Sequence, residues 1–161
     1  MTDRNIYDIL AELQINYEEI CHPAVYTVAE AQALERQLDG ADCKNLLLTD
    51  RHGTQFFLIV LAAEKKANIK EISTLVGVPH LRFASAEQLQ NVLGVIPGSV
   101  TPLGIIHDMN NLTTLLFDQA LENRPIQCHP NINTRTLVLS YGDLIRFVEH
   151  EHHKWMLFDA C

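Results

Sequence analysis

Apolar residues recur along the chain at two spacings, one typical of helices and one typical of strands. Helical spacing near the N-terminus predicts a first helix, carrying Ile6, Ile9, Leu10 and Leu13, with Asp3 as its N-cap. The Ala- and Glu-rich stretch 27–34 predicts a second helix. Three later helices are expected at residues 68–76, 86–93 and 143–151, the first two ended by glycines.

β-rich runs lie between these helices. The clearest is a hairpin, in which the apolar run 45–49 and the run 55–62 flank the turn residues 50–53. Shorter strands are expected at residues 17–21, 82–83, 112–117 and 136–140. Strands and helices do not alternate strictly, which favours a mixed or antiparallel sheet flanked by helices. No repeat or linker-like stretch interrupts the chain, so we expect one α/β domain over residues 1–161.

Composition narrows the class of protein. The chain has 161 residues, of which 47% are apolar and 20% charged, as in soluble globular domains. No apolar run approaches the roughly 20 residues that cross a bilayer, and the N-terminus lacks a signal-peptide pattern. The four cysteines form no CxxC pair, which predicts reduced thiols and a cytoplasmic protein. A net charge of −8 argues against DNA binding and leaves room only for a short nucleic-acid end held by a local basic patch.

Three places carry candidate chemistry. Lys44 and Asn45 open an apolar strand, where an ammonium could reach a phosphate or a carbonyl oxygen, or could simply be solvated. A Gly- and Pro-rich loop could aim its backbone amides at an oxyanion, or could be an ordinary turn. Its candidate residues are Gly98, Ser99, Val100, Thr101 and Pro102.

The third place is the loop 128–134, which holds Cys128, His129 and Asn131. His129 is a candidate general base, although the loop could equally be an Asx-rich turn before a strand. Cys128 beside His129 suggests a nucleophile and base, but neighbouring strand residues point to opposite faces. The histidine-rich segment 150–153 is better explained as a solvated helix end than as a metal site, since only one of its pairs has ligand spacing.

Five motifs together resemble those of the YbaK and prolyl-tRNA synthetase-associated domain family. The first is His22-Pro23 with residues 27–31, and the second is Lys44-Asn45 with residues 46–48. The third is Gly94-Val95 with residues 97–104, the fourth is residues 129–131, and the fifth is Asn133-Thr134. The likeness covers about residues 5–150 and is closest to the free-standing alanyl-tRNA(Pro) deacylases. It implies a compact domain with a mixed, curved sheet, an enzyme that hydrolyses the ester of mischarged tRNA(Pro), and no metal or cofactor. Its partners would be the acceptor end of tRNA(Pro) and, transiently, prolyl-tRNA synthetase.

The resemblance also assigns roles to residues. It implies catalytic roles for Lys44, Gly98 and His129, and substrate contacts for His22, Asn45, Ser99, Val100, Thr101, Pro102 and Asn131. Family members are thought to use a bound water and the 2′-hydroxyl of the tRNA rather than a side-chain nucleophile. Three alternatives stay open: a binding module of the same fold that hydrolyses nothing, a deacylase for another amino acid such as cysteine, and a thiol hydrolase that uses Cys128.

Overall fold

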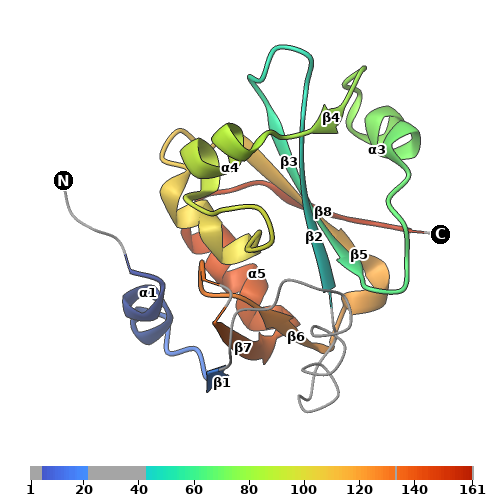
Figure 1. Cartoon of the computed structure of the whole chain (residues 1–161). Helices are drawn as coiled ribbons and strands as arrows, with labels where there is room; N and C mark the ends of the chain where they lie inside the picture. Colours follow the sequence, from blue (N-terminus) through green and yellow to red (C-terminus); the bar gives the residue numbers. More distant parts are fainter. Residues whose placement is uncertain (1–4, 22–42, 133, 161) are drawn as a thin grey trace.

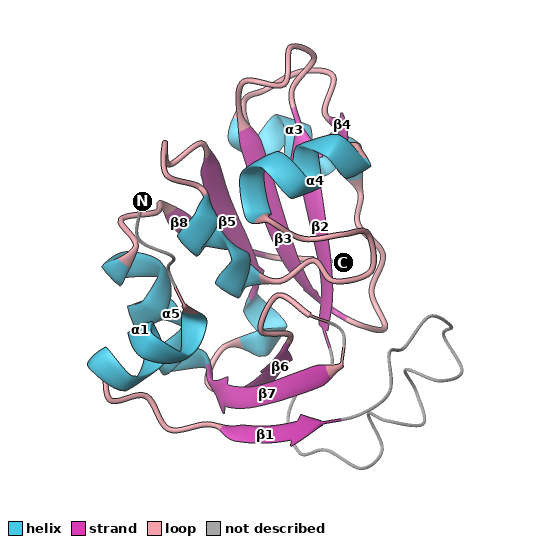
Figure 2. Cartoon of the chain, turned by 60° about the vertical axis from the view of Figure 1, so that its left-hand side comes forward, coloured by secondary structure: helices cyan, strands magenta, loops and turns pink. Residues whose placement is uncertain are grey.

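The computed structural model describes residues 5–21, 43–132 and 134–160 and contains two β-sheets with helices packed around them (Figures 1 and 2). The larger sheet has the strand order β4-β2-β3-β5-β8 and the smaller one has the order β1-β7-β6. The strands are β1 (Glu18–Cys21), β2 (Cys43–Thr49), β3 (Phe56–Ala62), β4 (Arg82–Phe83), β5 (Thr113–Asp118), β6 (Pro125–Cys128), β7 (Arg135–Ser140) and β8 (Trp155–Phe158). The helices are α1 (Ile6–Glu12), α3 (Ile69–Val76), α4 (Ala86–Leu93), α5 (Tyr141–His150) and the 3₁₀ helices η1 (Pro102–His107) and η2 (Gln119–Leu121).

The larger sheet is mixed. β2 and β3 form the expected antiparallel hairpin, while β3 with β5 and β5 with β8 run parallel. The Asp50 carboxylate fixes the hairpin turn by accepting the amides of Thr54 at 2.8 Å and Gln55 at 3.3 Å. All residues of β3 are buried, because both faces of this strand are covered. Its unbroken apolar run follows from that position.

Two apolar cores lie on the two faces of the larger sheet. The main core is formed by buried side chains of α1, α4, η1, α5 and the smaller sheet, packed on one face. The second core lies on the other face under α3 and includes Ile72, Leu81 and Phe158. The smaller sheet is antiparallel throughout, and in Figure 2 it lies below the larger one, beside the start of β2.

The predicted α/β class with a mixed sheet flanked by helices is confirmed, and the structure adds the second, antiparallel sheet. The local sequence signals at the ends of α3 and α4 were reliable. Ser85 forms a capping box with Gln88, and Gly77 and Gly94 end α3 and α4 with left-handed backbone. No helix in the described part of the chain has the length and apolar character of a membrane span.

Several predicted boundaries are wrong, and some elements were missed. Asn5 rather than Asp3 caps α1, because the Asn5 side chain accepts the Tyr7 amide at 2.8 Å. α5 begins at Tyr141 after the cap Ser140, two residues before the expected start. The strands β6 and β8 and both 3₁₀ helices were not predicted. The expected helix at 27–34, together with Asp3, His22 and Asn133, lies outside the described residues.

Candidate functional site

The segment 96–99 is a tight turn that needs its glycine. The Ser99 amide donates to the Ile96 carbonyl at 3.0 Å, Pro97 occupies the second position, and Gly98 the third with φ of +91°. A type II turn takes proline at the second position and requires positive φ at the third. A Cβ on Gly98 would meet no atom within 4 Å. The glycine is therefore required by backbone conformation, whereas the sequence suggested close approach to a ligand.

Beyond the turn, some backbone amides have acceptors and others do not. The Leu103 amide donates to the Thr101 hydroxyl at 3.3 Å, and the Gly104 amide donates to the Thr101 carbonyl at 3.1 Å. Within the described part of the chain, the amides of Val100 and Thr101 donate no hydrogen bond. Thr101 is fully buried. Since a buried amide without an acceptor is rare, the Thr101 N–H group is a candidate for binding a ligand oxygen, and the neighbouring N–H group of half-buried Val100 is a second candidate.

Asn131 comes against this loop from the smaller sheet. The Asn131 backbone has φ of +67°, and its Oδ1 atom lies 3.4 Å from the position that a Cβ on Gly104 would take. That same Cβ would lie 3.1 Å from the Leu93 carbonyl oxygen, so Gly104 allows α4, η1 and Asn131 to meet. The Asn131 Oδ1 atom is buried and accepts no hydrogen bond from the described residues. An acceptor thus lies next to the loop that holds the unpaired donors.

The start of β2 places Asn45 on the face of the larger sheet that carries the main core. Asn45 pairs with Val60, which belongs to the main core, and its buried Oδ1 atom also lacks a hydrogen-bond donor among the described residues. Lys44 pairs with Leu61 and therefore faces the second core. Its Nζ atom donates to the Lys65 carbonyl at 2.6 Å. The two neighbours that the sequence grouped together thus leave β2 on opposite faces.

β6 brings His129 close to β2. Cys128 ends β6, and its thiol lies near enough to Cys43 at the start of β2 for the charge of that group to affect it. Burial first, and then Cys43, raises the pKa of the Cys128 thiol. Cys128 is therefore a core thiol, and this finding argues against the alternative of a thiol hydrolase that uses Cys128.

His129 is half-buried and is oriented by a backbone contact. Its Nδ1 atom lies 3.0 Å from the Arg135 carbonyl. Because a carbonyl only accepts, this contact places a proton on Nδ1. The contact with Arg135 therefore fixes the orientation of the His129 ring.

The interpretation of the histidine-rich segment 150–153 as a solvated helix end is only partly right. α5 ends at His150, so the His150–His153 pair does not lie on one helix. His153 is buried with its Nδ1 atom 2.9 Å from the Thr113 carbonyl. No group of three potential metal ligands occurs among the residues that the structure describes.

The structure therefore joins two of the three predicted places most directly. The 98–102 loop and Asn131 meet through Gly104, and Asn45 lies on the same face of the sheet. Ser99 and Pro102 are buried and shape the loop, while Val100 packs against the main core. Gly104 was missed as a site residue, although its place two residues after Pro102 in a Gly- and Pro-rich segment was a usable signal.

Comparison with known proteins decides the family. A family model described as the aminoacyl-tRNA editing domain matches residues 22–147. The chain belongs to this family. The match spans the start of β2, the 98–104 segment and the loop at His129, and it confirms the resemblance found in the sequence motifs. An editing domain of this family is a hydrolase that removes the amino acid from a tRNA, so the interpretation as a pure binding module is not favoured.

Relatives of the editing domain cover most of the chain. The prolyl-tRNA editing protein ProX of Acetoanaerobium sticklandii is 37% identical over 141 residues, which are 87% of this chain and 86% of that protein. The prolyl-tRNA synthetase associated domain-containing protein 1 of Danio rerio is 33% identical over 153 residues, covering 93% and 83%. A crystal structure of a proposed trans-editing enzyme for prolyl tRNA synthetase superposes with a TM-score of 0.73 at 17% identity, covering 99% and 98%, which supports the fold.

Proposed function

We propose that this editing domain acts in trans on mischarged tRNA(Pro) and that the amino acid it removes is alanine. The observation that carries the proposal is the pair of unpaired amides at Val100 and Thr101, next to the unpaired oxygen of Asn131. The similarity to a prolyl-tRNA editing protein along 87% of the chain supports tRNA(Pro) as the substrate. Alanine is the expected error, because a synthetase pocket built for proline cannot strongly exclude a smaller side chain.

The reaction is hydrolysis of the ester between the amino acid and the terminal ribose. Water adds to the carbonyl carbon, the carbonyl oxygen becomes an oxyanion, and the carbon–oxygen bond to the ribose then breaks. The ribose oxygen takes up a proton, and free amino acid and tRNA are released. In this proposal the Val100 and Thr101 amides bind the oxyanion, where fixed donors act most strongly on developing charge.

The remaining predicted residues act around that centre. Gly98 and Pro102 hold the loop in shape through the turn and the first residue of η1. Asn45 and Asn131 supply acceptor oxygens for donors of the substrate, such as its ammonium or ribose hydroxyl groups. His129 is the proposed catalytic residue that contacts the substrate, and the Arg135 carbonyl orients its ring. Lys44 neutralises a phosphate near the ester, for which its ammonium would leave the Lys65 carbonyl.

Prolyl-tRNA synthetase is the proposed transient partner, because it produces the mischarged tRNA. The name of the Danio rerio relative refers to a domain associated with that synthetase. A cytoplasmic location stays a prediction from the cysteine pattern, and independence from metals and cofactors stays a prediction from the resemblance.

A panel of charged tRNAs tests the proposal. Alanyl-, cysteinyl- and prolyl-tRNA(Pro), with correctly charged alanyl-tRNA(Ala), are incubated with the protein and scored for remaining ester. Hydrolysis of alanyl-tRNA(Pro) with sparing of prolyl-tRNA(Pro) is the expected result. Preference for cysteinyl-tRNA(Pro) would reassign the amino acid, and intact esters throughout would refute the proposed activity.

A further inference from the structure

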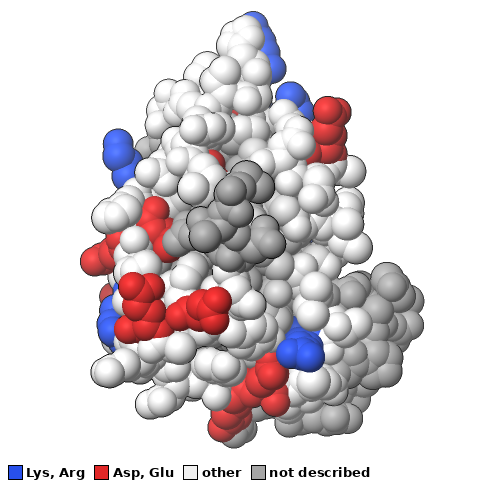
Figure 3. Space-filling view, turned by 90° about the vertical axis from the view of Figure 1, so that its left-hand side faces the viewer, with Lys and Arg blue, Asp and Glu red and all other residues white. Residues whose placement is uncertain are grey.

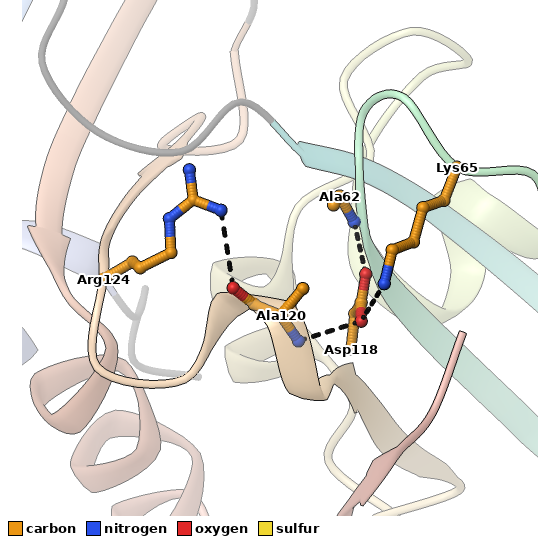
Figure 4. A network of polar contacts seen from close by, with 5 residues as sticks. All are labelled: Ala62, Lys65, Asp118, Ala120 and Arg124. Atoms are coloured by element: carbon orange, nitrogen blue, oxygen red, sulfur yellow. Dashed lines mark hydrogen bonds and ion pairs between the residues drawn. The ribbon is translucent and has the colours of Figure 1, made fainter. Parts of the chain in front are cut away.

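A small group of cations lies beside the candidate site and is built around one buried carboxylate. Asp118 ends β5, and its side chain is fully buried. It accepts the Ala62 amide at 3.1 Å, the Ala120 amide at 3.0 Å and the Lys65 ammonium at 3.0 Å (Figure 4). These contacts fix the position of Lys65 at the end of the β3–β5 pair.

Two further cations attach to the same framework. Lys44 donates to the backbone carbonyl of Lys65 at 2.6 Å, and the Arg124 guanidinium donates to the carbonyl of Ala120 at 3.4 Å. Figure 4 shows Arg124 and Lys65 approaching the Asp118–Ala120 turn from opposite sides. A continuous chain of contacts therefore joins Lys44, Lys65 and Arg124.

Lys66 extends the group. It lines a groove of about 400 Å³ together with Gln119, the first residue of η2, and with the carboxylates Glu71 and Asp159. We call Lys44, Lys65, Lys66 and Arg124 the basic edge. The exposed carboxylates of Glu64 and Glu122 lie on the same two turns, and within the described ranges no ion pair links either of them to these cations.

Some cations elsewhere in the described part of the chain are held in ion pairs. Arg135 and Arg146 are held by Glu19 at 3.7 Å and Asp143 at 3.0 Å. Lys44, Lys66 and Arg124 are exposed and have no carboxylate partner among the described residues, which is also true of Arg51, Lys70, Arg82 and Lys154. The basic edge is set apart by the contacts that join Lys44, Lys65 and Arg124. Figure 3 shows Asp and Glu side chains gathered on the lower part of one face, with Lys and Arg scattered around them, and the net charge of the chain is −8. Unpaired cations in such a protein are suited to an anionic ligand.

We propose that the basic edge binds the phosphates of the nucleotides that precede the esterified end of the tRNA. The inference rests on the proposed function, because the ester must lie by Asn45 and the 98–104 loop. Lys44 directly precedes Asn45 in β2 but faces the other side of the sheet. In this proposal a nucleotide strand that leaves the site around the start of β2 reaches Lys44 first and then Lys65, Lys66 and Arg124. An acidic protein can in this way hold a short RNA end without a basic surface overall.

Arg124→Gln and Lys66→Gln test this surface, because both residues are exposed. Arg82→Gln is the matched control: Arg82 is also exposed, and it pairs with Thr49 at the far end of β2. Binding of an uncharged acceptor-stem RNA of tRNA(Pro) is measured at 50 and 200 mM salt. Each lost phosphate contact should lower the magnitude of the slope of log K against log salt by about 0.7–0.9. The drop in the binding constant between 50 and 200 mM salt should then be about threefold smaller than in wild type.

The expected result is weaker RNA binding with a shallower salt slope for both variants, and an unchanged slope for Arg82→Gln. Hydrolysis of an aminoacyl-adenosine ester, which lacks these phosphates, should keep its wild-type rate. Slopes equal to wild type in both variants would overturn the inference, as would a loss confined to binding of prolyl-tRNA synthetase. If wild type hydrolyses no aminoacyl-tRNA, the proposed function fails, while direct RNA binding still tests the basic edge.

Discussion

Replacement of Gly98 tests whether the backbone conformation of the 96–99 turn is required for activity. Gly98 has φ of +91° and open space where a Cβ would lie, so valine there should not clash. It should instead be strained, because an L-residue with left-handed backbone costs about 1–2 kcal/mol, and a β-branched residue more. The Pro97–Gly98 peptide is expected to rotate to relieve this strain, and the amides of Val100 and Thr101 would then lose their alignment.

The expected effect is larger on activity than on stability. Loss of one oxyanion donor lowers the rate by about a hundredfold or more. A domain with about 5 kcal/mol of stability that loses about 2 kcal/mol is still more than about 99% folded, so unfolding would not explain such a loss. Single-turnover deacylation of alanyl-tRNA(Pro), urea unfolding and a tRNA-binding assay measure the three quantities separately. Binding of tRNA should change little.

Gly77 offers a matched control for this strain. It ends α3 with φ of +71°, and a Cβ there would also meet no atom within 4 Å. Gly77→Val should therefore lose similar stability and keep its deacylation rate. Gly98→Asn should recover much of the activity, because a type II turn accepts asparagine at its third position. A folded Gly98→Val protein with the wild-type rate, or an equal loss of activity in Gly77→Val, would refute the role of the turn.

Four further predictions concern single groups. Lys44→Ala should slow deacylation at least about tenfold, or about 1.4 kcal/mol, without unfolding, and a wild-type rate would make it a solvated lysine. Cys128→Ser should keep its activity, measured per folded protein, and a loss would revive the thiol mechanism. Activity should survive dialysis against a chelator, whereas loss restored by zinc would indicate a metal site. Asp118→Asn should lower the free energy of unfolding at pH 7 by about 2 kcal/mol or more, and an unchanged urea midpoint would contradict this.

The pH dependence of the Asp118 effect follows from its environment. Burial would raise the pKa of this carboxyl, but hydrogen bonds from Ala120, Ala62 and Lys65 outweigh burial, and its pKa lies below the ordinary value. At pH values above the ordinary pKa of an aspartate, a lowered pKa in the folded protein stabilises the folded state. This contribution is lost as the pH falls through the pKa of the folded protein. The gap between wild type and Asp118→Asn should therefore be constant near neutral pH and close below about pH 4.

Elements with local signals could be predicted from the sequence, and elements that depend on distant partners could not. The β2–β3 hairpin and α4 carry their turn and cap residues within a few positions, so their bounds were nearly right. β6 and β8 are four residues each, and they form because β7 and β5 lie beside them. No short window of sequence contains that information.

The candidate site shows the same division. The motif order located the Gly98 turn and the His129 loop, but motifs do not state which way side chains point. The alternation of side chains along a strand would have separated Lys44 from Asn45, as it separated Cys128 from His129. Arg124 and Lys65 join one network only through Asp118, 53 residues from Lys65, and sequence spacing does not report such a contact.

The parallel pairing of β8 with β5 bears on how the larger sheet completes its folding. The family match ends at residue 147, before β8 begins, and yet Trp155 to Phe158 cover the open side of β5. Until those residues have left the ribosome, the side of β5 that faces away from β3 has no partner strand. An unpaired edge of this kind recruits strands from other molecules. β8 closes this side of β5, so we expect a chain without β8 to aggregate more readily than the full chain.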